Sequence, residues 1–169
     1  TDTFCVISGL DASTAYDVYV KSACDAQHTS GWALATITTE CGAESVPYAE
    51  TFENVTGSYV IPDCWERVIS YTSGSSLYPY VYSSNAHNGS KCLYMYIPSS
   101  TTASENIIAL PPVDDINTLK VSLWAKYSSN VPQAFEIGYM RNGEFTAVKS
   151  ITLTTTYQQY TAYMSQAPA

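Results

Sequence analysis

The segment from Leu10 to Val20 constrains the fold of this chain more than any other part of the sequence. Leu10 closes one predicted strand, and residues 11–15 form a polar turn. Tyr16 then begins a second strand in which Tyr16, Val18 and Val20 share one face, because side chains alternate across a strand. This pattern is typical of a β-sandwich corner, where a tyrosine hydroxyl bonds to the backbone upstream of it. About nine residues precede Leu10, which is room for one strand, so we expect the opening strands of this sandwich to be missing.

The composition predicts a globular protein with acidic character. The chain has 169 residues, enough for one large or two small domains. Apolar residues make up 46% and charged residues 13%, which favours a buried core over disorder. The net charge of −8 argues against nucleic acid and anionic membranes as partners. No stretch is apolar enough to predict a transmembrane segment.

The five cysteines predict structural disulfides. They are widely scattered, and no pair has the close spacing of a zinc or redox motif. Disulfides place the protein in an oxidising compartment outside the cytoplasm. The odd number leaves at least one cysteine unpaired, and the alternative is that all five are reduced. Among the many pairings that remain open, we favour Cys64 with Cys92, because both lie in the second half of the chain.

The pattern of short runs rich in Val, Ile, Tyr and Thr predicts an all-β fold. The dipeptide Asn142-Gly143 predicts a two-residue hairpin turn. Residues 103–110 are too short for a helix and are followed by two prolines, so no helix is expected there. The expected strands are residues 3–8, 16–24, 32–39, 81–82, 92–97, 119–126, 134–140, 145–153 and 157–164.

Residues 41–47 contain a Cys-Gly-Ala sequence and end in a proline, which predicts a linker between two serial antiparallel β-sandwich modules. Residues 1–40 resemble the last three strands of a fibronectin type III domain, because they carry its L-x-x-x-T-x-Y-x-V-x-V corner. The positions that match this corner are Leu10, Thr14, Tyr16, Val18 and Val20.

Residues 48–169 resemble a MAM-like jelly-roll domain, found as the cleaved-adhesin domain of gingipain-type proteins and other exported Bacteroidetes surface proteins. The resemblance begins at residues 47–53 and at the Pro-Asp-Cys-Trp sequence of residues 62–65. It continues through residues 108–113, 119–126 and 135–139. Such domains usually run on into further strands, so we expect this module also to be incomplete.

The same resemblance makes calcium a candidate cofactor, although no cofactor is certain. Many relatives carry an acidic calcium loop after the tryptophan, but residues 70–76 contain no carboxylate. Calcium prefers six to eight oxygen ligands. Glu53 and Asn54 are the candidate metal ligands, and the alternative is that both are solvated turn residues.

Tyrosines provide the candidate ligand site. The chain has 15 tyrosines, and Tyr78, Tyr80 and Tyr82 would share one side of an extended segment. Such rings can receive the apolar faces of sugars while their hydroxyls bond to sugar oxygens. The alternative is ordinary sheet packing of favoured strand residues. Pro79 predicts an edge strand or a loop, which would leave the rings accessible.

The two histidines, His28 and His87, lie outside any nucleophile motif, so no catalytic residues are predicted. We therefore expect a non-catalytic module, secreted or at the cell surface, that binds a glycan or a host or matrix protein beside further domains of the same polypeptide. Two alternatives stay open, namely a structural spacer in a surface protein and an accessory domain of a secreted peptidase or glycosidase.

Overall fold

The computed structural model describes residues 4–25, 27–97, 105–129 and 133–168, and it is all-β, as the sequence predicts. Contacts divide the chain into two units, Thr1–Ala43 and Glu44–Ala169. No helix in the described residues is both long and apolar enough to cross a membrane. The strands are β1 Ala15–Val20, β2 Ala33–Thr38, β3 Glu66–Ile69, β4 Tyr71–Ser73, β5 Ser76–Tyr78, β6 Tyr80–Tyr82, β7 Cys92–Tyr94, β8 Ile107–Ala109, β9 Lys120–Ala125, β10 Ala134–Arg141, β11 Glu144–Thr152 and β12 Gln158–Tyr163, with one 3₁₀ turn, η1 Ile116–Thr118.

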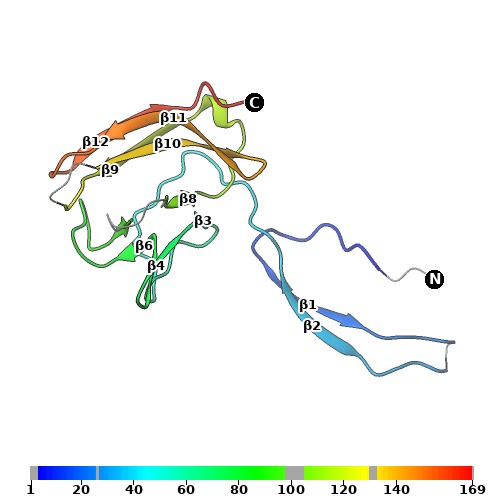
Figure 1. The fold of residues 1–169 in the computed structure, drawn as a ribbon. Helices are drawn as coiled ribbons and strands as arrows, with labels where there is room; N and C mark the ends of the chain where they lie inside the picture. The colour runs from blue at the N-terminus through cyan, green and yellow to red at the C-terminus, as the bar shows by residue number, and fades with distance from the viewer. Residues whose placement is uncertain (1–3, 26, 98–104, 130–132, 169) are drawn as a thin grey trace. The chain divides into compact units, whose positions relative to one another are not determined.

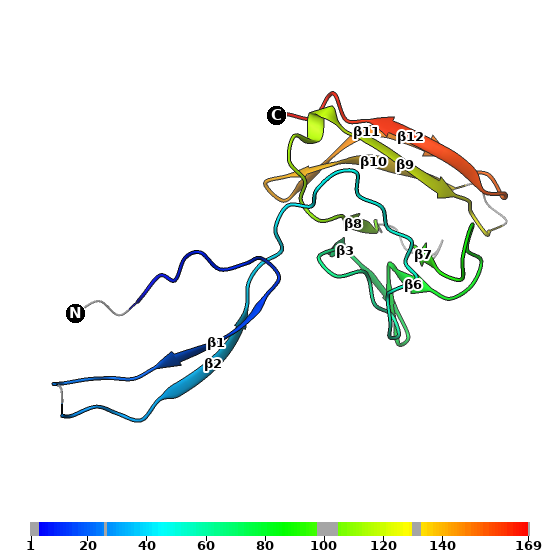
Figure 2. The same ribbon diagram turned by 180° about the vertical axis from the view of Figure 1, so that it is seen from behind.

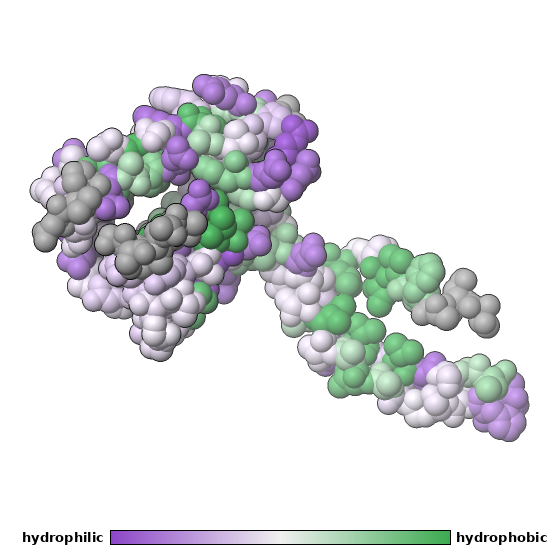
Figure 3. Space-filling model, in the orientation of Figure 1, coloured by the Kyte–Doolittle hydropathy of each residue, from purple (hydrophilic) through white to green (hydrophobic). Residues whose placement is uncertain are grey.

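The first unit is a two-stranded antiparallel ribbon of β1 and β2 (Figure 1). The hydrogen bond expected at the corner is present, because the Asp11 backbone N–H donates to the Tyr16 hydroxyl oxygen at 3.0 Å. Thr39 closes the corner by donating its hydroxyl to the Asp11 carbonyl at 2.6 Å. The space-filling view shows hydrophobic residues gathered along this ribbon (Figure 3). Trp32 and Val20 are more than 60% exposed, so the ribbon buries neither.

The buried core of the second unit lies between its longer strands. Strands β9 and β12 pair antiparallel, as do β10 and β11. Ile137, Ile151, Ala162 and Met164 are buried together where the two pairs meet. Figures 1 and 2 show β9 to β12 on one side of this unit and the short strands β3, β6 and β8 on the other.

The predicted hairpin between β10 and β11 is confirmed. Arg141 pairs with Glu144, and Asn142 and Gly143 adopt φ values of 53° and 80°. Positive φ at both central residues is the signature of the type I′ turn, whose twist matches that of paired strands. At Gly138 the register shifts, and a Cβ there would lie 2.0 Å from the Thr146 carbonyl oxygen. Only glycine therefore fits this bulge.

The short strands of the second unit pair as β3 with β8, β4 with β5 and β6 with β7. The sequence predicted β6 and β7 in part but missed β3, β4, β5 and β8, which are only three or four residues long. Alternation over so few residues does not distinguish a strand from a loop. The strand expected over residues 3–8 is wrong for residues 4–8, which form no ladder, and residue 3 lies outside the described residues.

The expectation of a structural disulfide is confirmed, but the favoured pairing is wrong. Cys64 is bonded to Cys41, and Cys92 is a free thiol together with Cys5 and Cys24. Cys92 lies in the β6–β7 ladder, and its Sγ donates to the Ser84 carbonyl at 3.2 Å. The thiol therefore contacts neighbouring backbone.

We expect the double variant Cys41→Ser, Cys64→Ser to lower the free energy of unfolding by about 3 kcal/mol, because the bond restricts a loop of the unfolded chain. Chemical denaturation of the unreduced protein measures this change. The control is Cys24→Ser, since Cys24 is an exposed free thiol and its replacement should change stability by less than about 0.5 kcal/mol.

Alkylation of the unfolded but unreduced protein provides a second check on the pairing. We expect the intact mass to rise by three adducts, at Cys5, Cys24 and Cys92. Five adducts, or a crosslinked peptide that contains Cys92, would contradict the pairing of Cys41 with Cys64.

Candidate ligand-binding site

Seven tyrosines pack together on and around the short strands, and we call them the tyrosine cluster. The β6–β7 register places Tyr80 opposite Tyr94, and the β4–β5 register places Tyr71 opposite Tyr78. Residues opposite each other in an antiparallel ladder project to the same face, so the two strand pairs bring their rings together. The members are Tyr59, Tyr71, Tyr78, Tyr80, Tyr82, Tyr94 and Tyr96.

Tyr94, like Tyr80, contacts four other rings of this cluster. Its ring centroid lies 5.6 Å from that of Tyr78, 5.8 Å from Tyr80 and 5.6 Å from Tyr82. A fourth ring, Tyr96, lies 6.5 Å away. These separations fall in the range preferred by aromatic pairs. One substitution at Tyr94 would therefore remove contacts to four neighbouring rings.

The cluster has a buried part and an exposed part. Tyr80 is only 9% exposed, whereas Tyr82, Tyr94 and Tyr96 are 40%, 36% and 38% exposed. The planes of these three outer rings are tilted by 35° from Tyr82 to Tyr94 and by 33° from Tyr94 to Tyr96. We call these three residues the outer strip. It offers adjacent ring surfaces to solvent.

The three tyrosines predicted from the sequence lie side by side, with centroids 5.1 Å apart from Tyr78 to Tyr80 and 6.1 Å apart from Tyr80 to Tyr82. Their planes meet at 51° and 84°, so the three rings do not form a flat row. The alternation of side chains along a strand predicts that the three rings share one side, but it does not predict that Tyr80 is buried. Tyr94 and Tyr96 are also two residues apart. Pairing their strand with β6 would have predicted that they belong to the same site.

Arg67 on β3 stabilises the cluster through hydrogen bonds to two of its backbone segments. Its Nε donates to the Pro79 carbonyl at 2.7 Å, and its Nη2 donates to the Tyr59 carbonyl at 2.6 Å. Pro79 is almost fully buried and separates Tyr78 from Tyr80 in the chain. Burial lowers the pKa of Arg67, yet an arginine still keeps its charge at neutral pH. The guanidinium therefore holds two tyrosine-bearing segments in place, and nothing in the local sequence indicates this role.

The hydroxyls of Tyr80 and Tyr94 remain protonated at neutral pH. Burial, followed by the charge of neighbouring phenols, raises the pKa of Tyr80 and of Tyr94. Hydrogen bonds with Ser76 and then Ser75 lower the pKa of Tyr59. Protonated phenols can both donate and accept hydrogen bonds. The outer strip thus combines apolar ring surface with groups that suit a polyhydroxylated ligand.

Glu53, one of the two candidate metal ligands, accepts several hydrogen bonds from a distant loop. Its Oε1 accepts from the backbone N–H groups of Ser90 at 2.8 Å and Lys91 at 2.9 Å, and its Oε2 accepts from the Ser90 hydroxyl at 2.6 Å. The hydroxyl bond, followed by the two N–H bonds, lowers the pKa of Glu53. Lys91 Nζ donates in return to the Glu53 carbonyl at 2.9 Å. This carboxylate therefore connects two loops.

The second candidate ligand, Asn54, is exposed beside Glu53. In the described part of the chain, no group of three or more His, Cys, Asp or Glu side chains is gathered as a metal would require. Calcium binding at Glu53 and Asn54 stays a prediction from the sequence.

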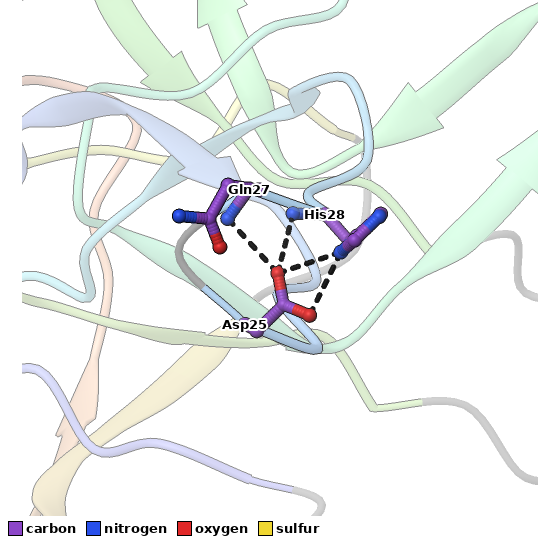
Figure 4. Close-up of polar contacts among 3 residues, drawn as sticks. All are labelled: Asp25, Gln27 and His28. Carbon is purple, nitrogen blue, oxygen red and sulfur yellow. Dashed lines mark hydrogen bonds and ion pairs between the residues drawn. The ribbon is translucent and has the colours of Figure 1, made fainter.

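The first unit carries a separate polar cluster in the loop between β1 and β2 (Figure 4). Asp25 Oδ1 accepts from the backbone N–H groups of Gln27 at 2.9 Å and His28 at 2.8 Å. The Nδ1 atom of His28 lies 2.7 Å from both carboxylate oxygens. The His28 side chain, followed by the two N–H groups, lowers the pKa of Asp25. All of these bonds lie within one turn, so they stabilise the loop itself.

No protein-family model, no curated protein and no solved structure matches this chain. The resemblance to fibronectin type III and MAM-like domains therefore rests on the sequence motifs. The site has to be interpreted from its own geometry.

We expect Arg67→Met to lower the free energy of unfolding by about 3 kcal/mol, because it removes the guanidinium that donates to the carbonyls of Tyr59 and of the buried Pro79. Chemical denaturation measures this change. Arg141→Met is the matched control, because Arg141 is exposed at the β10–β11 hairpin. Equal stability of the two variants would show that Arg67 does not brace the cluster.

Proposed function

We propose that this protein is a non-catalytic binding module, exported to an oxidising environment, that recognises glycans through the outer strip of the tyrosine cluster. The observation that carries the proposal is the exposure of three adjacent rings, Tyr82, Tyr94 and Tyr96, over a buried and braced aromatic base. Aromatic rings bind sugars because the C–H face of a pyranose buries apolar area against them while the phenol satisfies sugar oxygens.

Rigidity supports this role. Tyrosine carries a large contact surface on a side chain with little rotamer freedom, so binding to it costs little conformational entropy. Here the rings are restricted further, because Tyr94 contacts four other tyrosines and Tyr80 is buried beneath it. A prearranged surface loses less free energy to ordering when a ligand binds.

The non-catalytic part of the proposal is supported by the use of both histidines in local packing. His28 is bonded to Asp25 in the loop of the first unit. His87 is stacked on Trp124, with centroids 3.9 Å apart and planes within 9° of each other. A general base has to reach the proton that it abstracts, and these rings are held by neighbouring side chains instead.

Export is supported by the disulfide between Cys41 and Cys64, since such bonds persist mainly in oxidising compartments. The sequence resemblance to cleaved-adhesin domains points in the same direction and suggests adhesion at a cell surface.

A glycan array probed with the intact chain tests the proposal, followed by calorimetry with each oligosaccharide that binds. We expect Tyr82→Ala and Tyr96→Ala each to weaken binding about tenfold, through the loss of one ring contact of about 1.4 kcal/mol. Their stability should change little, because both rings are partly exposed.

The matched control is Tyr163→Ala, which removes a tyrosine that is 67% exposed at the end of β12, outside the cluster. Its affinity should equal that of the wild type. Absence of binding to any arrayed glycan, or equal loss in the control, would contradict the proposed function.

A further inference from the structure

The outer strip continues into a second group of side chains that includes a lysine. Tyr82 lies opposite Cys92 in the β6–β7 ladder, so both project to the same face. Burial raises the pKa of the Cys92 thiol, and a hydrogen bond with Tyr157 partly offsets this rise. The Tyr157 ring lies 5.2 Å from that of His87, which is stacked on Trp124. Cys92 therefore links the outer strip to Tyr157, and ring contacts lead from Tyr157 through His87 to Trp124 on β9.

Lys126 stands at the end of this path. Its Nζ lies 5.0 Å from the centroid of the Tyr157 ring. Such a cation–π contact positions an ammonium group but leaves its charge uncompensated. Among the described residues the structure records a single ion pair, His28 with Asp25, so Lys126 has no carboxylate partner there. In a chain of net charge −8, this is a local positive site surrounded by an acidic protein.

A shallow hollow of about 430 Å³ adjoins Lys126. It is lined by Lys126 together with Tyr127, Ser128, Ser129 and Thr155, so hydroxyl groups dominate its wall. The Tyr127 backbone N–H donates to the Thr154 carbonyl at 2.9 Å and joins the two sides of the hollow. The hollow has room for a sugar residue, and the combination of one ammonium group with several hydroxyls suits a sugar that carries a carboxylate.

We propose that Lys126 and this hollow bind an acidic sugar residue, a uronic or sialic acid, of a glycan whose neighbouring sugars lie on the outer strip. This inference rests on the proposed glycan-binding function and adds the chemical class of the ligand. The carboxylate of the sugar pairs with the Lys126 ammonium group, which has no carboxylate partner among the described residues. The exposed indole of Trp124, already backed by His87, provides apolar surface beside it.

Paired oligosaccharides that differ only in whether their carboxylates are free or esterified test this proposal with the intact chain. Oligogalacturonate is compared with its methyl ester, and sialyllactose with sialyllactose methyl ester, by calorimetry at low and at physiological salt. We expect the acidic member of at least one pair to bind about tenfold more tightly, as a charge-assisted hydrogen bond allows, and to lose this advantage as salt rises.

The variant Lys126→Gln should bind the acidic and the neutral member with about equal affinity, and its affinity for the neutral member should equal that of the wild type. Lys120→Gln is the control, because Lys120 is exposed at the opposite end of the same strand, and it should keep the preference.

The outcomes separate this inference from the function on which it rests. Equal binding of acidic and neutral members, or an equal effect of the two lysine variants, overturns the acidic-sugar site and leaves glycan binding in place. Absence of binding by every member of both pairs and by the glycan array overturns both.

Discussion

The contact between the Arg67 guanidinium and two backbone carbonyls is the interaction on which the proposed site depends. The tyrosines of the cluster come from separate short strands, and strands of three residues have too few ladder hydrogen bonds to fix their positions alone. Arg67 joins the segments that carry Tyr59 and Pro79 at 2.6 and 2.7 Å. The Val81 N–H adds a backbone bond to the Val60 carbonyl at 2.8 Å between the same segments. A planar guanidinium suits this role because its donors diverge at fixed angles.

The cluster supported by Arg67 has an inner and an outer part. Tyr80 packs against Tyr59 with centroids 5.0 Å apart and is covered, while Tyr82 and Tyr94 remain partly exposed at the surface. The inner ring contributes packing and the outer rings contribute contact surface. The same division holds beside β9, where His87 supports one face of Trp124 while much of the indole remains exposed. A supported but exposed ring is what a sugar-binding surface requires.

The sequence predicted much of the fold but only part of the site. Long alternating runs located β1, β2 and β9 to β12, and the Asn142-Gly143 pair located a hairpin turn. Strands β3, β4, β5 and β8 were missed because three or four residues carry no clear period. The pairing of Cys41 with Cys64 has no local signal either. The roles of Arg67 and Glu53 depend on partners that are distant in the sequence: Glu53 meets Ser90 and Lys91, and only the folded chain reveals such contacts.

A nuclear magnetic resonance titration of the isotopically labelled intact chain tests the central claim most directly, with an oligosaccharide selected from the array. The account predicts that amide shifts change at Tyr82, at residues 92–96 and around Lys126, while the amides of β10 and β11 stay in place. Shifts confined to the β1–β2 ribbon or to β10 and β11 would contradict the account, because they would locate binding away from the tyrosine cluster.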